Sequence, residues 1–473
     1  MSFSRAWAWT AVALLVGLAQ PALAQSTDSY FEFLQARRLE ADGDAKGALA
    51  ALERAATADP RSAEVRAEIA SLHLRRNERA EAEKAAKAAL ALDETNVEAN
   101  RVLGLLNAAA VEGANERTPA AQTAQALRDA ILYLERAVTG AGVTADANLQ
   151  YQLGRLYIRS GNPDKAVQAL TRVIAQNPNS VQGRLALAQA FAAGKDLRAA
   201  INTLDEILEE EPRVASALAQ YQEDAGQFKE AADTLTLALA IQPNSRDLKV
   251  RRIAVLVEAK DYAKAAGFAG DARKQHPDDP RFPRLQGRAL FDGGDRSAGL
   301  AVLEAGVKAF PKDINMLFTL ADAYADAGRS ADAEKSLRQL LSADPNNASA
   351  MNYLGYLLAN RGERDQLDEA VRLVQKALEA EPDNGAYLDS LGWAYFRKGD
   401  LENAEKYLAS AAQKLPDNSE IQDHLGDLQA RRNRWSEAIA AWNKALAGDG
   451  QDVEKAAIEK KISNAKGKIQ NAK

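Results

Sequence analysis

Residues that could perform acid–base or metal chemistry are few in this 473-residue chain, and they lie far apart. The only histidines are His73, His276 and His424, which fall in distant segments, so we expect no two of them to meet. Cysteine is absent, which excludes disulfides, zinc–thiolate sites and thiol catalysis. Carboxylates are abundant, but they are spread along the whole chain, as on solvated helix faces.

Sequence motifs for the common reactions are missing as well. The chain contains no G-x-S-x-G, no H-E-x-x-H and no Walker A loop. A catalytic site needs clustered ligands or a nucleophile paired with a base, and neither is indicated here. We therefore predict a protein that is not an enzyme, with no cofactor and no metal site. The net charge of −6, from 60 basic and 66 acidic residues, also argues against nucleic acid as a partner.

One basic cluster could bind an anion. Arg281, Arg284 and Arg288 are spaced by three and four residues, which places them on one face of a helix. Such a face could bind a carboxylate or an acidic peptide. The alternative is an ordinary solvated charged face, which is the more frequent role of such a run.

The first residues have the features of an export signal. Arg5 is followed by an apolar run from Ala6 to Ala19 and by the sequence Ala22-Leu23-Ala24, which is typical of a cleavage site. The run is shorter than the roughly 20 residues that a membrane-spanning helix needs. We therefore predict a signal peptide over residues 1–24 that is cleaved on export. No other segment could span a membrane, and without cysteine we expect no lipid anchor.

Prolines mark a regular period along most of the chain. Successive prolines are separated by 34, 31, 34, 34, 34, 37 and 34 residues. They are Pro178, Pro212, Pro243, Pro277, Pro311, Pro345, Pro382 and Pro416. A period near 34 residues indicates repeated helical hairpins, which cannot bury their apolar faces alone and must stack.

The segment LDSLGWAYFRKGDLENAEKYL, residues 388–408, shows how one hairpin is encoded. Leu388, Leu391, Gly392 and Tyr395 lie at i, i+3, i+4 and i+7, which is one stripe of a helix. A break at Gly399-Asp400 precedes a second helix whose small residues recur in the same way. Small residues at these positions let the two backbones approach closely, while leucine and tyrosine fill the flanking space.

This pattern resembles the tetratricopeptide repeat (TPR) family from Ser29 to about Asp452. The resemblance implies an all-α fold, a right-handed α-solenoid of about twelve helix-turn-helix units. The basic segment 453–473 would be a capping helix, in which Ile458, Ile462 and Ile469 could cover the last unit. We group the units as 29–146, with an insertion at about 107–128 in the third unit, 147–313, and 314–452. Within these groups the units are 29–62, 63–96, 97–146, 147–180, 181–214, 215–245, 246–279, 280–313, 314–347, 348–384, 385–418 and 419–452.

In TPR proteins the first helix of each unit lines the concave face, and its residues contact partners. Carried over to this sequence, the resemblance implies a groove that mixes aromatic, amide and charged side chains and suits a peptide or a partner helix. Trp393 is the strongest candidate, although aromatic residues also pack between neighbouring units. The groove residues are Asn352, Tyr356, Asn360, Asp389, Trp393, Phe396, Arg397, Asp423, Asp427 and Arg431.

The C-terminal third resembles a narrower group. The blocks NYLGYLLA (352–359), DSLGWAY (389–395) and DHLGD (423–427) are similar to those of exported proteobacterial TPR proteins. They are also similar to periplasmic adaptors that present substrates to carboxyl-terminal processing proteases, although those adaptors carry a lipid-modified cysteine. The resemblance implies a periplasmic scaffold that binds protein segments, with an envelope protease or its substrates among the possible partners. The alternative is a TPR component of an envelope system for exopolysaccharide assembly or export.

Overall fold

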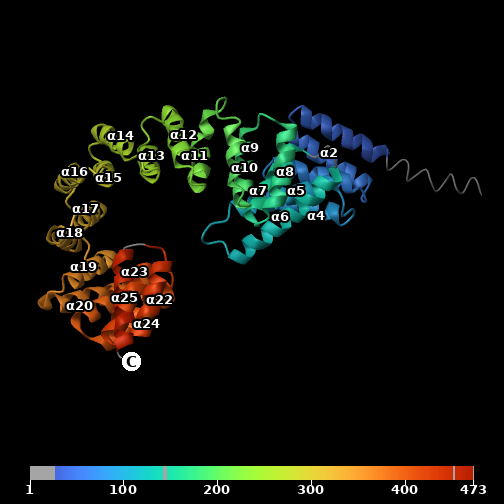
Figure 1. Ribbon diagram of the computed structural model, residues 1–473. Coiled ribbons are helices and arrows are strands. Elements are labelled where there is room, and N and C mark those ends of the chain that lie inside the picture. Colours follow the sequence, from blue (N-terminus) through green and yellow to red (C-terminus); the bar gives the residue numbers. More distant parts are fainter. Residues whose placement is uncertain (1–26, 142–145, 451–452, 472–473) are drawn as a thin grey trace, which may run out of the picture. The chain divides into compact units, whose positions relative to one another are not determined.

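The computed structural model describes residues 27–141, 146–450 and 453–471, so the predicted signal peptide lies outside the described residues. Within these ranges the chain forms helices joined by short turns, and no strand occurs there (Figure 1). The prediction of an all-α fold is confirmed. Of the described helices, none combines the length and apolar character needed to cross a membrane.

The chain divides into two compact units, residues 1–243 and 244–473. This boundary lies inside our second group of repeats, 147–313, and not at either of its ends. The first unit starts with a helix over residues 27–41, and consecutive helices then pair as antiparallel neighbours. The helices that follow are α2 (Ala45–Ala58), α3 (Ala63–Arg75), α4 (Arg79–Leu90), α5 (Val97–Glu112), α6 (Ala120–Ala141), α7 (Ala147–Arg159), α8 (Pro163–Gln176), α9 (Val181–Ala193), α10 (Leu197–Asp205), the short 3-10 helix η2 (Pro212–Val214), α11 (Ala215–Asp224) and α12 (Phe228–Ile241).

The second unit continues the pairing and contains the C-terminal candidate groove. Each range that we expected to form one repeat here holds two helices. The helices are α13 (Arg246–Glu258), α14 (Tyr262–Gln275), α15 (Arg281–Asp292), α16 (Arg296–Ala309), α17 (Ile314–Asp326), α18 (Ser330–Ala343), α19 (Ala348–Arg361), α20 (Arg364–Ala380), α21 (Gly385–Lys398), α22 (Leu401–Lys414), α23 (Ser419–Arg431), α24 (Trp435–Ala447) and α25 (Lys455–Asn471).

The recurring prolines act together with a capping residue two positions later. After Pro382 and Pro416, the side chains of Asn384 and Asn418 accept hydrogen bonds from backbone N–H groups in the first turns of α21 and α23. Such a cap satisfies a donor that the helix itself cannot pair and stabilises the helix by about 1 kcal/mol. The same proline-x-cap arrangement begins other first helices, with caps at Ser62, Ser180, Ser245, Asp313 and Asn347.

Close contact between the two helices of a hairpin explains the small residues. A Cβ atom added to Gly392 would lie 2.7 Å from Leu408 Cγ and 2.9 Å from the Leu408 backbone nitrogen. At Gly426 the same atom would lie 2.4 Å from the ring of Trp442. These distances are far below van der Waals contact, so the second helix occupies the space that a side chain would need.

The hairpin α15–α16 has glycine in its second helix, at Gly299 and Gly306, where several other second helices have alanine. A Cβ atom on Gly299 would lie 2.7 Å from the Gly287 carbonyl oxygen and 2.7 Å from the Phe291 nitrogen. The missing side chain therefore allows an unusually close approach of the two backbones, rather than loosening the pair.

The insertion in the third repeat lengthens its two helices. Helix α5 has 16 residues and α6 has 22, whereas α3 and α4 of the preceding repeat have 13 and 12. Residues 113–119 connect α5 to α6. Buried side chains along α6, including Ala130 and Leu134, keep the long helix packed on α5 and α7.

The C-terminal helix α25 closes the second unit by packing on α24. Ile458, Ile462 and Ala465 are buried against Ala438 and Trp442. The last hairpin would otherwise expose an apolar face, so α25 takes the place of a further repeat. The predicted capping segment therefore forms a helix, whose bounds are Lys455–Asn471.

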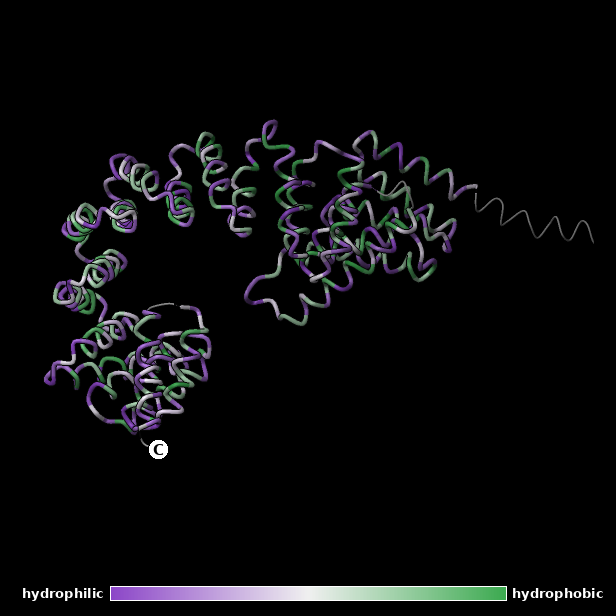
Figure 2. The backbone as a smooth tube through the Cα atoms, in the orientation of Figure 1, coloured by the Kyte–Doolittle hydropathy of each residue, from purple (hydrophilic) through white to green (hydrophobic). Residues whose placement is uncertain are grey.

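Within the second unit, the two helices of each hairpin have different surroundings. Along the curve from α13 to α18, the first helices α13, α15 and α17 lie on the inner side and α14, α16 and α18 on the outer side (Figure 1). Neighbouring first helices also touch each other, as α19 touches α21 and α21 touches α23. Hydrophobic and hydrophilic residues alternate along the helices, as expected for elements that bury one side only (Figure 2).

Because Gly392 is closely packed and Gly267 is not, we predict that alanine has opposite effects on stability at these two positions. Gly392→Ala should lower the stability of the C-terminal hairpins by about 1–3 kcal/mol, because the added methyl group meets Leu408. Gly267→Ala, in α14, should be stabilising by up to about 1 kcal/mol, because nothing lies within 4 Å of that position. Urea unfolding followed by circular dichroism measures both effects. A Gly392→Ala protein as stable as the parent would contradict the close-contact explanation.

Candidate functional site

The first helices α17, α19, α21 and α23 together surround a pocket of about 310 Å³. Because consecutive first helices lie side by side, residues about one repeat apart in the sequence become neighbours across the surface. The pocket is lined by aromatic rings, hydroxyl groups, amides and carboxylates. Its residues are Phe318, Ser349, Asn352, Tyr353, Tyr356, Ala386, Tyr387, Asp389, Ser390, Leu415, Asn418, Glu420 and Ile421.

A buried ion pair lies between α21 and α23. His424 Nδ1 is 3.0 Å from Asp389 Oδ2 and 3.1 Å from Asp389 Oδ1, and the two side chains are only 8% and 6% exposed. Burial opposes a charged imidazole, but the Asp389 carboxylate outweighs it and raises the pKa of His424 above its ordinary value. The prediction that Asp389 is an open groove residue is corrected, because this side chain is enclosed and paired.

Trp393 lies on top of this pair. Its ring stacks on His424 with 4.0 Å between the ring centroids and on Phe396 with 5.0 Å. Its Nε1 donates to Asn360 Oδ1 over 2.6 Å, and Arg397 donates to the Asn360 carbonyl oxygen. Trp393 is half-buried. It therefore packs between repeats and links α19, α21 and α23, while its contact with a partner stays a prediction.

Tyr356 connects two repeats that are not adjacent in the sequence. Its hydroxyl donates to Glu420 Oε1, although the two residues are 64 positions apart. Burial of the phenol and the nearby Glu420 charge both raise the pKa of Tyr356, so it stays a neutral donor. The imidazole Nε2 of His424 is 3.9 Å from the same Glu420 oxygen. The inner faces of α19, α21 and α23 thus form one connected polar network.

The two ring nitrogens of His424 both lie near carboxylates, so this network does not have the geometry of a nucleophilic dyad. In a nucleophilic dyad, the second ring nitrogen of the histidine faces a hydroxyl or thiol. Here Nε2 faces a carboxylate, the ring of Trp393 stacks on His424, and the ring of Tyr356 lies nearby at a tilt. We also find no group of three potential ligands that could hold a metal ion among the described residues.

Two further predicted groove acids are held by the capping helix. Lys461 Nζ of α25 lies 2.8 Å from both carboxylate oxygens of Asp423 and 2.8 Å from Asp427. Asp427 also accepts a hydrogen bond from Trp442 Nε1. Burial raises the pKa of Asp427, while Lys461 opposes that shift. The prediction that these two acids face a partner is corrected, whereas Arg431 is exposed.

The basic cluster is also largely neutralised within the chain. Arg281 binds both oxygens of Asp279 and also reaches Asp247 of α13. Arg288 pairs with Asp292 and with Asp322 of α17. Arg284 is half-buried, and burial lowers its pKa. The cluster is therefore corrected from an open anion site to a set of ion pairs that tie neighbouring first helices together.

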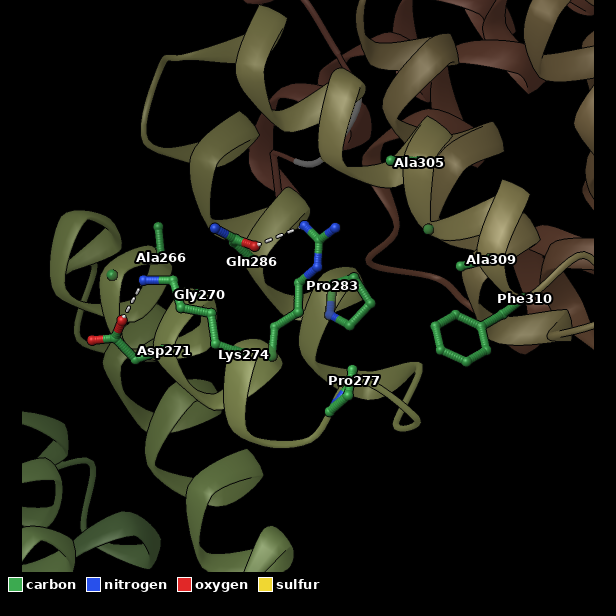
Figure 3. Close-up of a pocket in the computed structure, with 13 residues that line it drawn as sticks. Ala266, Gly270, Asp271, Lys274, Pro277, Pro283, Gln286, Ala305, Ala309 and Phe310 are labelled. Atoms are coloured by element: carbon green, nitrogen blue, oxygen red, sulfur yellow. Dashed lines mark hydrogen bonds and ion pairs between the residues drawn. The ribbon is translucent and has the colours of Figure 1, made fainter.

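A second, larger pocket of about 670 Å³ lies over α14, α15 and α16 (Figure 3). Small residues form much of its wall, among them Ala266, Gly270 and Ala305, and two prolines and Phe310 contribute apolar surface. Its charged groups are engaged nearby, since Lys274 pairs with Asp271 and Arg273 donates to Gln286.

The sequence alone missed several members of the C-terminal site. Glu420, Tyr353 and His424 were not among the predicted groove residues, yet each belongs to the network or the pocket wall. The sequence does contain a signal for His424. This residue lies 35 positions after Asp389, which is close to one repeat, so the two side chains are expected on neighbouring first helices. Glu420 carries no such signal, because its partner Tyr356 lies almost two repeats away.

Family models match most of the described chain. Two models, each described as tetratricopeptide repeat, cover residues 33–97, 121–221, 223–289 and 284–419 through overlapping matches. The matched regions include the helices that form the C-terminal pocket up to the turn before α23.

Curated relatives match only part of their own length. A TPR repeat-containing protein of Pseudomonas aeruginosa is 31% identical over 38% of this chain and 30% of that protein. Cellulose synthase operon protein C of Pseudomonas fluorescens is 31% identical over 26% of this chain and 10% of that protein. The chain therefore spans less than a third of the length of these relatives.

A solved structure aligns with most of the chain at low similarity. The yeast Tom70 structure aligns with 93% of this chain and 96% of its own, with 14% sequence identity and a TM-score of 0.45. At that similarity no conclusion about partners follows.

The buried pair generates a prediction about pH. The pKa of His424 is raised in the folded state, so the pair contributes stability below the ordinary histidine pKa, and this contribution is lost as pH rises through the raised value. The difference in urea midpoint between the parent and His424→Gln should therefore be largest below the ordinary histidine pKa and should shrink as the pH rises above it. His276 titrates in both proteins and cancels in the difference. A difference that stays constant with pH would show that the pair is not charged.

Lys461 generates a second prediction, about the capping helix. Lys461→Met should loosen α25 by about 1–3 kcal/mol, because Asp423 and Asp427 lose their shared cation while remaining partly buried. Hydrogen exchange of the α25 amides should become faster. Lys460→Met, at an exposed position of the same helix, is the matched control and should leave that exchange unchanged. Equal exchange rates in both variants would argue against the role of Lys461.

Proposed function

Because the chain belongs to the tetratricopeptide repeat family, we propose that it is a non-catalytic scaffold of the bacterial periplasm, which binds segments of other proteins on its first helices. TPR repeats generally mediate protein–protein interactions. The proposed compartment and the proposed binding surface rest on features of this chain. One observation supports the binding surface: α19, α21 and α23 form a connected polar and aromatic surface around a pocket.

The chemistry of this surface suits a peptide or a helix of a partner. Tyr353, Tyr356 and Trp393 offer flat rings with polar tips, which are enriched where proteins bind each other. Hydrogen bonds among Tyr356, Glu420, Trp393 and Asn360 hold these rings in place before a partner arrives. A surface that is already ordered loses less conformational entropy on binding, so more of the contact energy appears as affinity.

The proposed compartment follows from the N-terminal sequence. Residues 1–24 combine a basic start, an apolar run and a cleavage site, as in cleavable export signals. The partial match to a Pseudomonas aeruginosa TPR protein agrees with a Gram-negative source. A scaffold in this compartment could present one protein to another, including substrates to an envelope protease.

A second candidate function has a specific observation in its favour. Parts of this chain are 28–31% identical to cellulose synthase operon protein C of Pseudomonas fluorescens and Escherichia coli. A role in an envelope system for exopolysaccharide would use the same surface to hold a component of that system. The matches cover only 9–10% of those proteins, so this candidate ranks second.

Site-specific photo-crosslinking in living cells tests the proposed surface. A photoreactive amino acid at Asn360 or Arg431, both exposed on first helices, should give specific crosslinks to periplasmic proteins. The same residue at Lys376 or Glu402, exposed on second helices, should give few or none. Crosslinked proteins identified by mass spectrometry would separate the two candidates: proteases and their substrates favour the first, and polysaccharide-export components favour the second.

Two results would contradict the proposal. Crosslinks confined to Lys376 and Glu402 would place the binding surface on the second helices. A mature protein that keeps residues 1–24 and stays in the cytoplasmic fraction would remove the periplasmic part, whatever the crosslinks show.

A further inference from the structure

A smaller pocket, of about 280 Å³, lies in the first unit, where α7 packs on α6 and α8. Helix α7 contributes Gln150, Leu153 and Tyr157, and α8 contributes Gln168 and Arg172, each set spaced by three or four residues along one stripe. The three residues of α7 are buried, whereas the two of α8 are exposed, so the pocket has a buried floor and an open rim. Because α6 and α8 are second helices of their hairpins, this pocket is separate from the first-helix surface of the second unit.

The amide of Gln150 lies in the floor without a hydrogen-bond partner. The residue is only 3% exposed, and its side chain makes no hydrogen bond within the part of the chain that the structure describes. Buried amides are normally paired, because a buried polar group without a partner is costly. The Gln150 amide therefore offers both a donor and an acceptor to a group that enters the pocket.

The one acid in the wall is balanced by a neighbouring base. Glu135 of α6 accepts hydrogen bonds from the Tyr157 hydroxyl and from Lys165 Nζ, which is 2.9 Å away. Burial would raise the pKa of Glu135, but these two bonds outweigh it and lower the pKa, so the carboxylate stays ionised. The contacts tie α6, α7 and α8 together and use the charge of Lys165.

Arg172 carries the charge that remains. The residues that line the pocket include one acid, Glu135, and two bases, Lys165 and Arg172, which leaves one positive charge. Arg172 is exposed, and it makes no hydrogen bond or ion pair with the described residues. Burial and Glu135 raise the pKa of Tyr157, while the charge of Arg172 opposes that shift, in agreement with its place in the same pocket.

We infer that this pocket binds the carboxylate of an acidic side chain from a partner protein. The planar guanidinium of Arg172 can donate two parallel hydrogen bonds to a carboxylate, and the Gln150 amide can donate a third from the floor. A volume of about 280 Å³ is just below the range of pockets for whole small molecules and suits a single side chain.

Other charged groups fit this pocket less well. A basic side chain would be repelled by Arg172, and a doubly charged phosphate would meet only one unpaired guanidinium beside the Glu135 carboxylate. The assignment goes beyond the proposed function, because it adds a contact on the second helices of the first unit.

Parallel selection from a phage library of random twelve-residue peptides, on the full parent chain and on its Arg172→Gln variant, tests the assignment. The parent should enrich a set of peptides that Arg172→Gln does not retain, and these should share an aspartate or glutamate. Replacing that acid by asparagine or glutamine in the synthetic peptide should weaken binding about tenfold or more.

Arg198→Gln is the matched control for this selection. Arg198 is an exposed arginine of the next second helix, α10, without an ion pair to the described residues, and it does not line the pocket. This variant loses the same charge and should retain every peptide that the parent enriches.

Gln150→Leu separates a role in binding from a role in the fold. The variant keeps a similar volume and loses no hydrogen bond within the described chain, so its melting temperature should be unchanged or higher. It should nevertheless bind the acidic peptides severalfold more weakly. Their affinity for the parent should also fall as salt is raised, since the contact is electrostatic.

Three results would overturn the assignment. They are a selection with no peptide that depends on Arg172, Arg172-dependent peptides without an acid, and a Gln150→Leu protein that is less stable but binds these peptides as tightly as the parent. None of them bears on the first-helix surface of the second unit, whose crosslinks at Asn360 and Arg431 are measured separately.

Discussion

The close approach of two helices at a residue without a side chain is the contact on which this structure depends. At Gly392 the side chain and backbone of Leu408 in α22 lie where a Cβ atom would be. In the flanking hairpins, Val374 lies as close to Gly355 and the ring of Trp442 lies as close to Gly426. Each hairpin is held by leucine, alanine and tryptophan packed around that point. Because the same contact also occurs at Gly104, Gly154 and Gly287, the hairpins that contain these residues have similar shapes and can stack on their neighbours.

Stacking brings the first helices side by side, and this determines which charges meet. Arg281 pairs with Asp247, and Arg288 pairs with Asp322, in both cases 34 residues away in the sequence. Lys461 and Asp427 show the same separation at the end of the chain. These charged groups are therefore used between neighbouring repeats and do not form open patches.

The residues that we predicted to line the groove include both surface residues and a buried one. Trp393, Asn360, Phe396 and Arg397 cooperate at its surface, whereas Asp389 is buried beneath them with His424. The buried pair orients the tryptophan ring that stacks on it, so a side chain that no partner touches still shapes the surface that a partner would meet. Such support from below is a general requirement of an ordered binding surface.

The sequence by itself determined the helices, their order and the family. The 34-residue period, the prolines with their capping residues and the small residues at fixed positions are local signals, and each acts within one hairpin or its nearest neighbour. Only the tertiary structure decided which groove residues are open. Tyr356 meets Glu420 across 64 positions, and Lys461 returns to cover Asp423 and Asp427. These contacts depend on the curvature of the stack and on the docking of α25, which arise from the sum of many packing contacts and have no signature in a single repeat.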